Sequence, residues 1–314
     1  MGIDDKLYGQ GLMGTAAPSA ANLLSQRFLV PPFSILYARD GAWQARKEAW
    51  QRLGLEGDLP GVAAGRKDGL TYGEFKETDA ESTKKIRGTH TGTSMFDPVL
   101  CELCYRWFCP PGGQVVDPFA GGACRGVVAA LLGLQYWGCD LRLEQVESNR
   151  SQAAKICPGN PPTWVCGDSR DRVIEAPYAD FIFSCPPYGD LEQYSNNPAD
   201  LSNMAYSEFR RAYTAIIGDA CACLKDDRFA VFVVGDYRLG DGTYAGLPAG
   251  TQAAFIKAGL KLYNEAILVT VVGSASLRVS KQFNASRKLA KTHQNVLVFV
   301  KGDPKRASEA CKSE

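Results

Sequence analysis

The chain has 314 residues, of which 45% are hydrophobic and 22% charged, the usage of a folded globular protein and not of a disordered one. With 35 Lys and Arg residues against 34 Asp and Glu residues, the formal net charge is +1, so any nucleic-acid partner must be met by a local basic patch. No run approaches about 18 uninterrupted apolar residues, which excludes a transmembrane helix, and the first twenty residues show no apolar segment typical of a signal peptide.

The 11 cysteines are an odd number scattered through apolar runs, which favours a reducing cytoplasm over a disulfide-linked secreted fold. One C-x-x-C, Cys101 to Cys104, could suggest a metal or redox pair, but no second pair follows at zinc-ribbon spacing. The same stretch is typical of an apolar helix face. We therefore predict core packing for these thiols and no metal site.

The N-terminal third is predicted to be an accessory region, residues 1–87. Its first 22 or so residues are rich in Gly, Ala and Ser and indicate a loosely held tail. A helix is expected from about residue 41 to 53, with Trp43 and Trp50 on one face, where packing against the remainder of the protein is the expected role. Residues 54–92 are Gly-rich and charged and indicate loops.

From residue 113 onward, short apolar runs alternate with amphipathic stretches, the pattern of parallel strands joined by helices. Strands are predicted at 114–116, 136–139, 163–166, 180–184, 229–234, 262–272 and 295–300, and helices at about 124–133, 143–156, 206–225 and 249–259. Because only a polar loop separates the last two strands, they should form an antiparallel hairpin at one edge. The expected fold class is α/β, a Rossmann-like sheet of seven mostly parallel strands over residues 88–302, followed by a tail at 303–314.

The first predicted strand ends in Asp117-Pro118-Phe119-Ala120-Gly121-Gly122 and leads into a helix. Consecutive glycines at the carboxyl end of a strand let the backbone approach a ligand closely, although their spacing is neither that of a dinucleotide site nor that of a P-loop. The next two strands end in Asp140 and Asp168. Carboxylates there can accept from ribose hydroxyls and from an adenine amine, or each can cap the helix that follows.

The fourth predicted strand ends in Ser184-Cys185-Pro186-Pro187-Tyr188. Two prolines stiffen the backbone and remove two N–H donors. The tyrosine that follows offers a flat face on which a nucleic-acid base can stack. The loop from Gly189 to Asn203, rich in Asn, Asp and Ser, is the expected lid over this site.

Together these motifs resemble those of S-adenosylmethionine-dependent DNA amino-methyltransferases of the phage or prophage type. The family's cofactor loop, Asp-Pro-Phe-x-Gly-x-Gly, is similar to residues 117–122 with the second glycine moved forward, and its Asp/Asn/Ser-Pro-Pro-Tyr/Phe/Trp motif is similar to residues 185–188. Thr93, Ser94 and Phe96 resemble the segment that closes over the cofactor, with the aromatic ring on the adenine and a hydroxyl near the methionine carboxylate. The motif order is that of the γ arrangement.

The resemblance implies methyl transfer from S-adenosylmethionine to adenine N6 or cytosine N4 of a flipped base, with DNA as partner, in restriction–modification in a bacterial cytoplasm. It implies that Ser184, Cys185, Pro186, Pro187 and Tyr188 are catalytic, and that the cofactor is bound by Thr93, Ser94, Phe96, Asp117, Pro118, Phe119, Ala120, Gly121, Gly122, Asp140 and Asp168. One departure is Cys185, since the family has an oxygen acceptor there and sulfur is a weak one. Ser184 or the proline carbonyls would then accept from the target amine. The oligomeric state, monomer or homodimer, is left open.

A basic segment from Ser274 to His293 joins the last two predicted strands and contains no acidic residue. We predict that its cations contact DNA phosphates and make binding salt-dependent; the alternative is a solvated hairpin loop. The cations are Arg278, Lys281, Arg287, Lys288 and Lys291.

Three alternative functions use the same motifs. An RNA guanine-N2 or adenine-N6 methyltransferase also carries a Pro-Pro-Tyr loop, but no RNA-binding domain is recognisable in residues 1–90. A C5 methyltransferase would use Cys185 as a covalent nucleophile, but that family's Pro-Cys order is absent. The third alternative is a non-catalytic, S-adenosylmethionine-binding regulatory module.

Overall fold

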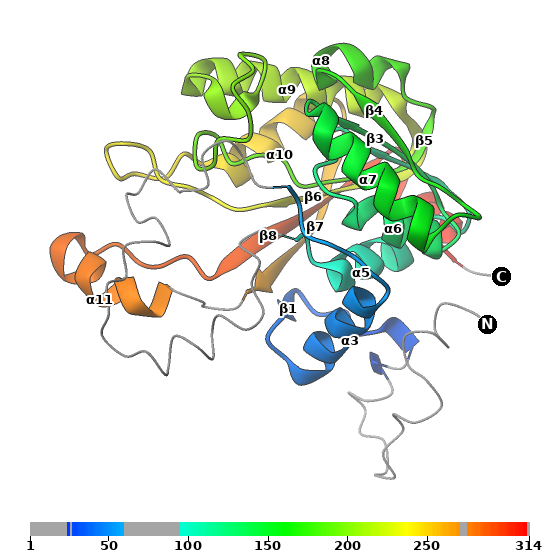
Figure 1. The fold of residues 1–314 in the computed structure, drawn as a ribbon, viewed down its shortest axis with the longest axis horizontal. Coiled ribbons are helices and arrows are strands. Elements are labelled where there is room, and N and C mark those ends of the chain that lie inside the picture. Colours follow the sequence, from blue (N-terminus) through cyan, green and yellow to red (C-terminus); the bar gives the residue numbers. More distant parts are fainter. Residues whose placement is uncertain (1–23, 26, 60–94, 271–274, 313–314) are drawn as a thin grey trace, which may run out of the picture.

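A computed structural model describes residues 24–25, 27–59, 95–270 and 275–312, and Figure 1 shows the arrangement of their helices and strands. One eight-stranded sheet has the order β1-β7-β8-β6-β5-β2-β3-β4. The strands are β1 (Ile35–Tyr37), β2 (Gln114–Asp117), β3 (Gln135–Asp140), β4 (Thr163–Cys166), β5 (Ala179–Ser184), β6 (Leu224–Val234), β7 (Lys261–Val269) and β8 (His293–Lys301). Strand β8 is antiparallel to both neighbours, β6 and β7, and the other pairs are parallel.

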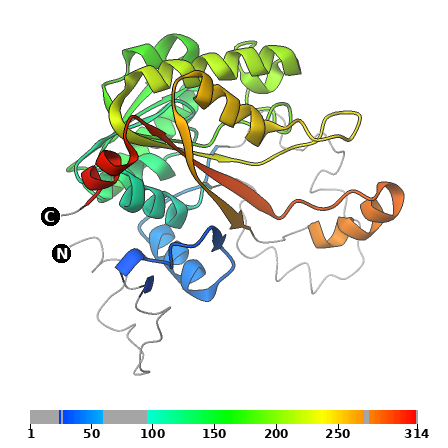
Figure 2. The same ribbon diagram turned by 180° about the vertical axis from the view of Figure 1, so that it is seen from behind.

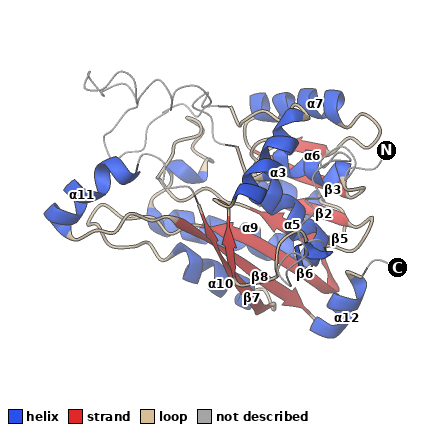
Figure 3. Cartoon of the chain, turned by 90° about the horizontal axis from the view of Figure 1, so that it is seen from below, coloured by secondary structure: helices blue, strands red, loops and turns tan. Residues whose placement is uncertain are grey.

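The helices cover both faces of this sheet (Figure 3). Helices α5 (Pro98–Phe108), α6 (Cys124–Leu131) and α7 (Leu143–Ile156) lie on one face. Helices α9 (Tyr206–Cys223) and α10 (Leu247–Lys257) lie on the other, and α8 (Ser169–Arg172) lies beside α9 (Figure 1). Strand residues alternate between the two cores, as the period of two in a strand requires: Val115 packs in one core and Val116 in the other.

The α/β class and all seven predicted strands are confirmed, as is the antiparallel pairing of the last two. Two details of that prediction are wrong. Strand β1 pairs in parallel with β7 and forms an eighth, outermost strand, so the hairpin does not lie at the edge. The connection between β7 and β8 contains a helix, α11 (Ala275–Ser286), in place of a plain polar loop, and Figures 1 and 2 show it standing away from the sheet.

The N-terminal segment packs on the rest of the α/β domain through α3 (Gly41–Arg52). Glu102 on α5 is fully buried, where it accepts a hydrogen bond of 2.9 Å from Trp50 Nε1 and ion-pairs with Arg46. Trp43 Nε1 donates to the carboxylate of Asp97, the residue that caps α5. The two tryptophans therefore pack as predicted, and residues 35–59 are structurally continuous with the domain that was expected to begin at residue 88.

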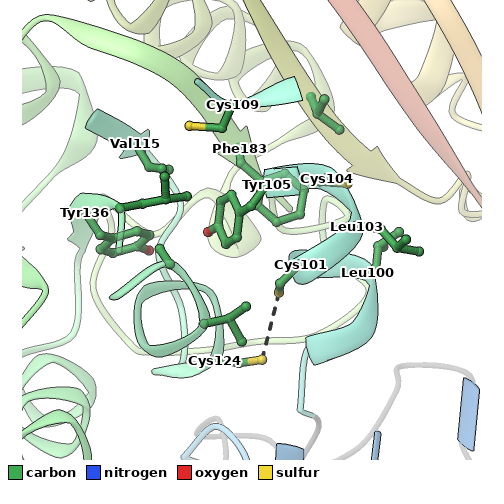
Figure 4. Close-up of a cluster of buried hydrophobic side chains, with 14 of the residues drawn as sticks. Leu100, Cys101, Leu103, Cys104, Tyr105, Cys109, Val115, Cys124, Tyr136 and Phe183 are labelled. Atoms are coloured by element: carbon green, nitrogen blue, oxygen red, sulfur yellow. Dashed lines mark hydrogen bonds between the residues drawn. The ribbon is translucent and has the colours of Figure 1, made fainter. Parts of the chain in front are cut away.

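The C-x-x-C cysteines are core residues, also as predicted. Cys101 and Cys104 lie on the buried face of α5, and the sulfur atoms of Cys101 and Cys124 are 3.9 Å apart (Figure 4). Burial raises the pKa of both C-x-x-C thiols, so they are protonated at neutral pH. All 11 cysteines are free thiols, and the described residues contain no cluster that could hold a metal ion.

The C-terminal residues expected as a tail contain a further helix, α12 (Pro304–Ala310). Asp303 caps it by accepting from the backbone N–H of Lys305, and Ala307 is fully buried. The ion pair between Arg306 and Asp227, at 2.8 Å, links α12 to β6. Within the described ranges, no helix has the length and apolarity needed to cross a bilayer.

Candidate cofactor and catalytic site

The loop after β2 is anchored on its buried side by an ion pair. Asp117 has no exposed surface and accepts hydrogen bonds from Arg125 Nε at 2.6 Å and from Tyr136 Oη at 2.8 Å. The same guanidinium donates to the backbone carbonyls of Phe119 and Ala120. Asp117 and Arg125 therefore fix the path of the predicted cofactor loop from inside the protein, and neither Asp117 nor Ala120 is exposed to a ligand.

Ser184, at the end of the neighbouring strand β5, belongs to the same buried network. Its hydroxyl is fully buried and donates to Asp117 Oδ1 at 2.5 Å. The hydrogen bond ties the carboxyl end of β5 to that of β2. This position corrects the expectation that Ser184 replaces the missing acceptor, because its oxygen lies in the core and not in the site.

Both glycines of the loop occupy positions that a larger residue would disturb. Gly121 has φ of +50°, in the left-handed region that favours glycine. Its N–H donates to Asp140 Oδ2 at 3.0 Å, and its carbonyl accepts from Asn149 Nδ2 at 2.7 Å. A Cβ built on Gly122 would collide with the carboxylate of Asp58. Both glycines are therefore required by the local backbone and its contacts.

Asp140 lies at the end of β3, where the resemblance places the ribose-binding carboxylate. One oxygen accepts from Gly121 N–H and the other from Arg142 N–H at 2.8 Å. Burial raises the pKa of this carboxyl to about 6, although the two backbone donors and the Arg142 guanidinium oppose the rise. Each oxygen retains a further lone pair with which to accept from a ligand hydroxyl.

Asp168, the third predicted carboxylate, is engaged as a helix cap. It accepts from the backbone N–H of Arg170 at 2.9 Å and forms an ion pair of 2.5 Å with the guanidinium of the same residue. Burial alone would raise its pKa, but the hydrogen bonds from Arg170 outweigh that effect and lower it. The capping role weighed in the sequence analysis accounts for Asp168.

The structure describes only one of the three residues predicted to close over the cofactor, Phe96. Phe96 packs edge-to-face on Phe183, with ring centroids 5.8 Å apart, and the Arg125 guanidinium lies 4.8 Å from the Phe96 ring centroid. It therefore borders the buried network beneath the cofactor loop. Thr93 and Ser94 lie outside the described residues.

The Pro-Pro-Tyr loop follows β5 and is held by its tyrosine. Tyr188 Oη accepts a hydrogen bond of 2.6 Å from Gln294 Nε2 on β8 and lies 3.6 Å from Cys185 Sγ. Gly189 has φ of +54°, and a Cβ there would collide with the ring of Tyr237. The Tyr188 ring is thus fixed in one orientation.

The thiol of Cys185 is half-buried beside this ring. Burial raises its pKa, with Arg125 and Tyr188 opposing the rise, so the thiol is protonated at neutral pH. A protonated thiol is a poor nucleophile. This environment disfavours a covalent role for Cys185.

The predicted lid, residues 189–203, is stabilised by its own polar side chains. Asp200 accepts from Ser195 Oγ at 2.8 Å and from Ser202 N–H, while Asn203 Nδ2 donates to the carbonyls of Ser195 and Asn197. The loop is joined to the cofactor side of the site through Arg142, which donates to the Tyr194 carbonyl at 3.2 Å.

The basic segment lies beside a second exposed loop. Lys281 and Arg287 are exposed, and Lys288 and Lys291 are half-buried. Lys291 Nζ lies 5.6 Å from the ring centroid of Tyr244, whose ring also stacks with Arg238 at 4.2 Å. Arg278 falls within α11, but its side chain is not among the described ones.

Sequence reasoning missed several polar residues that shape the site. Arg125 carries no motif that distinguishes it from a surface arginine. The buried stripe of Gln145, Asn149 and Gln152 on α7 has helical spacing. That spacing is a usable signal, but a polar stripe normally indicates a solvent-facing side. Asp58 lies in the region that was expected to be featureless loops.

Comparisons with known proteins give distant structural similarity. No protein-family model and no curated protein matches the chain.

TrmN from Thermus thermophilus is 17% identical with a TM-score of 0.44, and the match covers 66% of this chain and 49% of that one. Magnesium protoporphyrin IX methyltransferase from Synechocystis is 14% identical at a TM-score of 0.42, covering 61% and 75%. A TehB-like S-adenosylmethionine-dependent methyltransferase from Corynebacterium glutamicum is 16% identical at 0.40, covering 70% and 95%. The chain thus spans about half the length of TrmN, and similarity of this size transfers neither substrate nor activity.

Proposed function

We propose that this chain transfers a methyl group from S-adenosylmethionine to an exocyclic amine of adenine or cytosine in DNA. The observation that carries the proposal is the meeting of the glycine loop, Asp140 and the Pro-Pro-Tyr loop at one place. That place is the carboxyl end of β2, where the chain continues through β3 and β4 on one side and β5 on the other. Ligands of open α/β sheets bind at such switch points.

The residues around the glycine loop fit a nucleoside cofactor. Gly121 and Gly122 present backbone without side chains, and Asp140 has lone pairs for two ribose hydroxyls. When bound, S-adenosylmethionine supplies an activated methyl group on a sulfonium. Orientation of the reacting groups would provide much of the rate.

The Pro-Pro-Tyr loop has the groups needed to hold a target amine. No described residue donates a hydrogen bond to the carbonyl of Pro186 or Pro187, so both oxygens are available as acceptors. Acceptors around the amine would localise its lone pair toward the methyl group. Tyr188, fixed by Gln294, would stack on a base flipped out of the duplex at a cost of a few kcal/mol.

DNA is proposed as the partner because cations lie on the segment that leads to Gln294, the residue that holds Tyr188. The connection from α11 to β8 carries Arg287, Lys288 and Lys291, which would contact phosphates. Assignment to restriction–modification or to a phage stays a prediction.

The test is transfer of labelled methyl from S-adenosylmethionine to unmethylated DNA and, in parallel, to total RNA. The proposal requires label in DNA above that in RNA. A Gly121→Val variant, strained at positive φ, serves as the negative control. Label in RNA alone favours the RNA methyltransferase, and cofactor binding without transfer to either favours the regulatory module.

A further inference from the structure

The segment Glu56–Leu59 lies along the buried polar face of α7. The backbone N–H of Glu56 donates to Gln152 Oε1 at 3.1 Å, and that of Leu59 donates to Gln145 Oε1 at 2.9 Å. The Leu59 carbonyl accepts from Arg142 Nη2 at 3.2 Å. The backbone is therefore anchored on both sides of Asp58.

These anchors are coupled to the cofactor loop itself. Gln145 Nε2 donates to Asn149 Oδ1 at 2.9 Å, and Asn149 donates in turn to the Gly121 carbonyl. Gln145 and Asn149 are both buried. One continuous set of hydrogen bonds thus runs from the Leu59 backbone to Gly121, and it positions Asp58 relative to the loop.

The Asp58 carboxylate lies directly against Gly122. A Cβ on Gly122 would collide with Asp58 Oδ1, so the glycine that departs from the family-like spacing is the one that makes room for this side chain. Among the residues that the structure describes, none donates a hydrogen bond to the carboxylate or forms an ion pair with it. Burial raises its pKa to about 6, against the opposing effect of Arg125 and Arg142. A poorly solvated carboxylate without a partner in a ligand site indicates a ligand contact.

The charge of Asp58 is felt in both halves of the site. Its charge contributes to raising the pKa of Asp140, at the end of β3, and that of Cys185, in the Pro-Pro-Tyr loop. Asp140 is the proposed ribose ligand and Cys185 precedes the proposed acceptors of the target amine. In S-adenosylmethionine the sulfonium joins the ribose to the methionine and carries the methyl group that must face the target.

We infer that Asp58 is a cofactor-binding residue. Its carboxylate contacts the positively charged sulfonium of S-adenosylmethionine and so distinguishes this ligand from S-adenosylhomocysteine. The inference rests on the proposed function. The product has lost the positive charge of the sulfonium but keeps the ribose, the adenine and the amino-acid ammonium. A carboxylate in a partly desolvated site interacts with a cation more strongly than it would in water. Asp58 thus favours bound substrate over bound product.

The experiment is calorimetric titration of the whole protein with each ligand separately at pH 8. For Asp58→Asn we expect about tenfold weaker binding of S-adenosylmethionine and less than about twofold change for S-adenosylhomocysteine. Asp58→Glu, which keeps the charge, should recover part of the preference. Glu56→Gln is the matched control, because it removes an exposed carboxylate two residues away, and it should bind both ligands as the wild type does.

Equal weakening of both ligands, no change, or tighter binding by Asp58→Asn would each overturn the inference. A thermal melt of each variant separates lost binding from lost folding. Should the wild type bind neither ligand, the proposed function itself fails. Should it bind both with no effect of Asp58, only the assignment of Asp58 fails.

Discussion

Asp117 and Ser184 occupy the carboxyl ends of adjacent strands and are joined by a buried hydrogen bond of 2.5 Å, so the glycine loop and the Pro-Pro-Tyr loop diverge from one fixed point. Arg125 completes this point with an ion pair of 2.6 Å to Asp117. Both loops are therefore positioned by side chains that are themselves buried.

Replacing Arg125 should lower the free energy of unfolding. Arg125→Met leaves Asp117 as a buried charge without its partner, which costs about 3–5 kcal/mol, and urea denaturation measures the loss. The matched control is Lys225→Met, which breaks the more exposed pair with Asp180 and should cost less than about 1 kcal/mol. Similar losses in the two variants would show that the Asp117 pair has no special role.

Replacing Cys185 by serine should preserve methyl transfer or increase it. Serine oxygen accepts hydrogen bonds better than sulfur, and the protonated thiol is not expected to act as a nucleophile. The measurement is kcat for methyl transfer, with Cys223→Ser, in a half-buried position on α9, as the control. Complete loss of turnover in Cys185→Ser alone would support the covalent mechanism.

Removing the Tyr188 ring should weaken binding of the target base. Tyr188→Ala is expected to lose about 1–3 kcal/mol of base stacking, whereas Tyr188→Phe keeps the ring and loses only the hydrogen bond from Gln294. Equilibrium binding to DNA, measured by fluorescence anisotropy, should thus rank wild type, Phe and Ala in that order. Equal affinities for all three proteins would show that Tyr188 does not contact the target base.

The unliganded protein should lose stability as pH rises through about 6. Burial raises the pKa of Asp58 and Asp140 from 3.8 to about 6, so the folded state binds more protons than the unfolded state between these values. Their stabilising effect is complete below pH 3.8 and is lost as pH rises through about 6. Arg125, Arg142 and Glu192 also face the Asp58 carboxyl.

Asp58→Asn isolates this contribution. The wild type should lose more stability than the variant between pH 5 and pH 7.5, by about 1.4 kcal/mol, as measured by urea denaturation at both values. The lowered pKa of His293, caused by burial and by Lys291, acts in the opposite direction but is common to both proteins. Parallel pH profiles for the two proteins would contradict the placement of Asp58 in the site.

Charge reversal in the basic segment should weaken DNA binding at every sequence. The double variant Arg287→Glu, Lys288→Glu removes two proposed phosphate contacts, so both the affinity and the slope of its logarithm against salt should fall. The control reverses Lys305 and Lys312, which are exposed on and just after α12. An unchanged salt slope in the first variant would show that the segment is a solvated connection without phosphate contacts.

Motifs at strand ends were predictable from the sequence because a strand followed by glycines, or by two prolines and an aromatic residue, is a local pattern. All seven strands and the placement of Gly121, Asp140 and Tyr188 follow from such patterns. The role of Ser184 was wrong because its hydroxyl is fully buried and donates to Asp117 on β2. That contact depends on the pairing of β5 with β2, which no local pattern specifies.

Long-range contacts account for most of what was missed. Asp58 and Gly122 are separated by a stretch that includes residues 60–94, so no spacing rule could bring them together. Strand β1 has only three residues and forms by pairing with β7. Helix α11 was missed because its basic residues resembled a solvated loop, whereas they fall within or just after a helix.

Nucleoside mass spectrometry after incubation with unmethylated DNA and S-adenosylmethionine tests the central claim most directly. We expect N6-methyladenine or N4-methylcytosine in the digest with the wild type and neither with Gly121→Val. Absence of both modified nucleosides across DNA of varied sequence, with a folded and cofactor-binding protein, would contradict it.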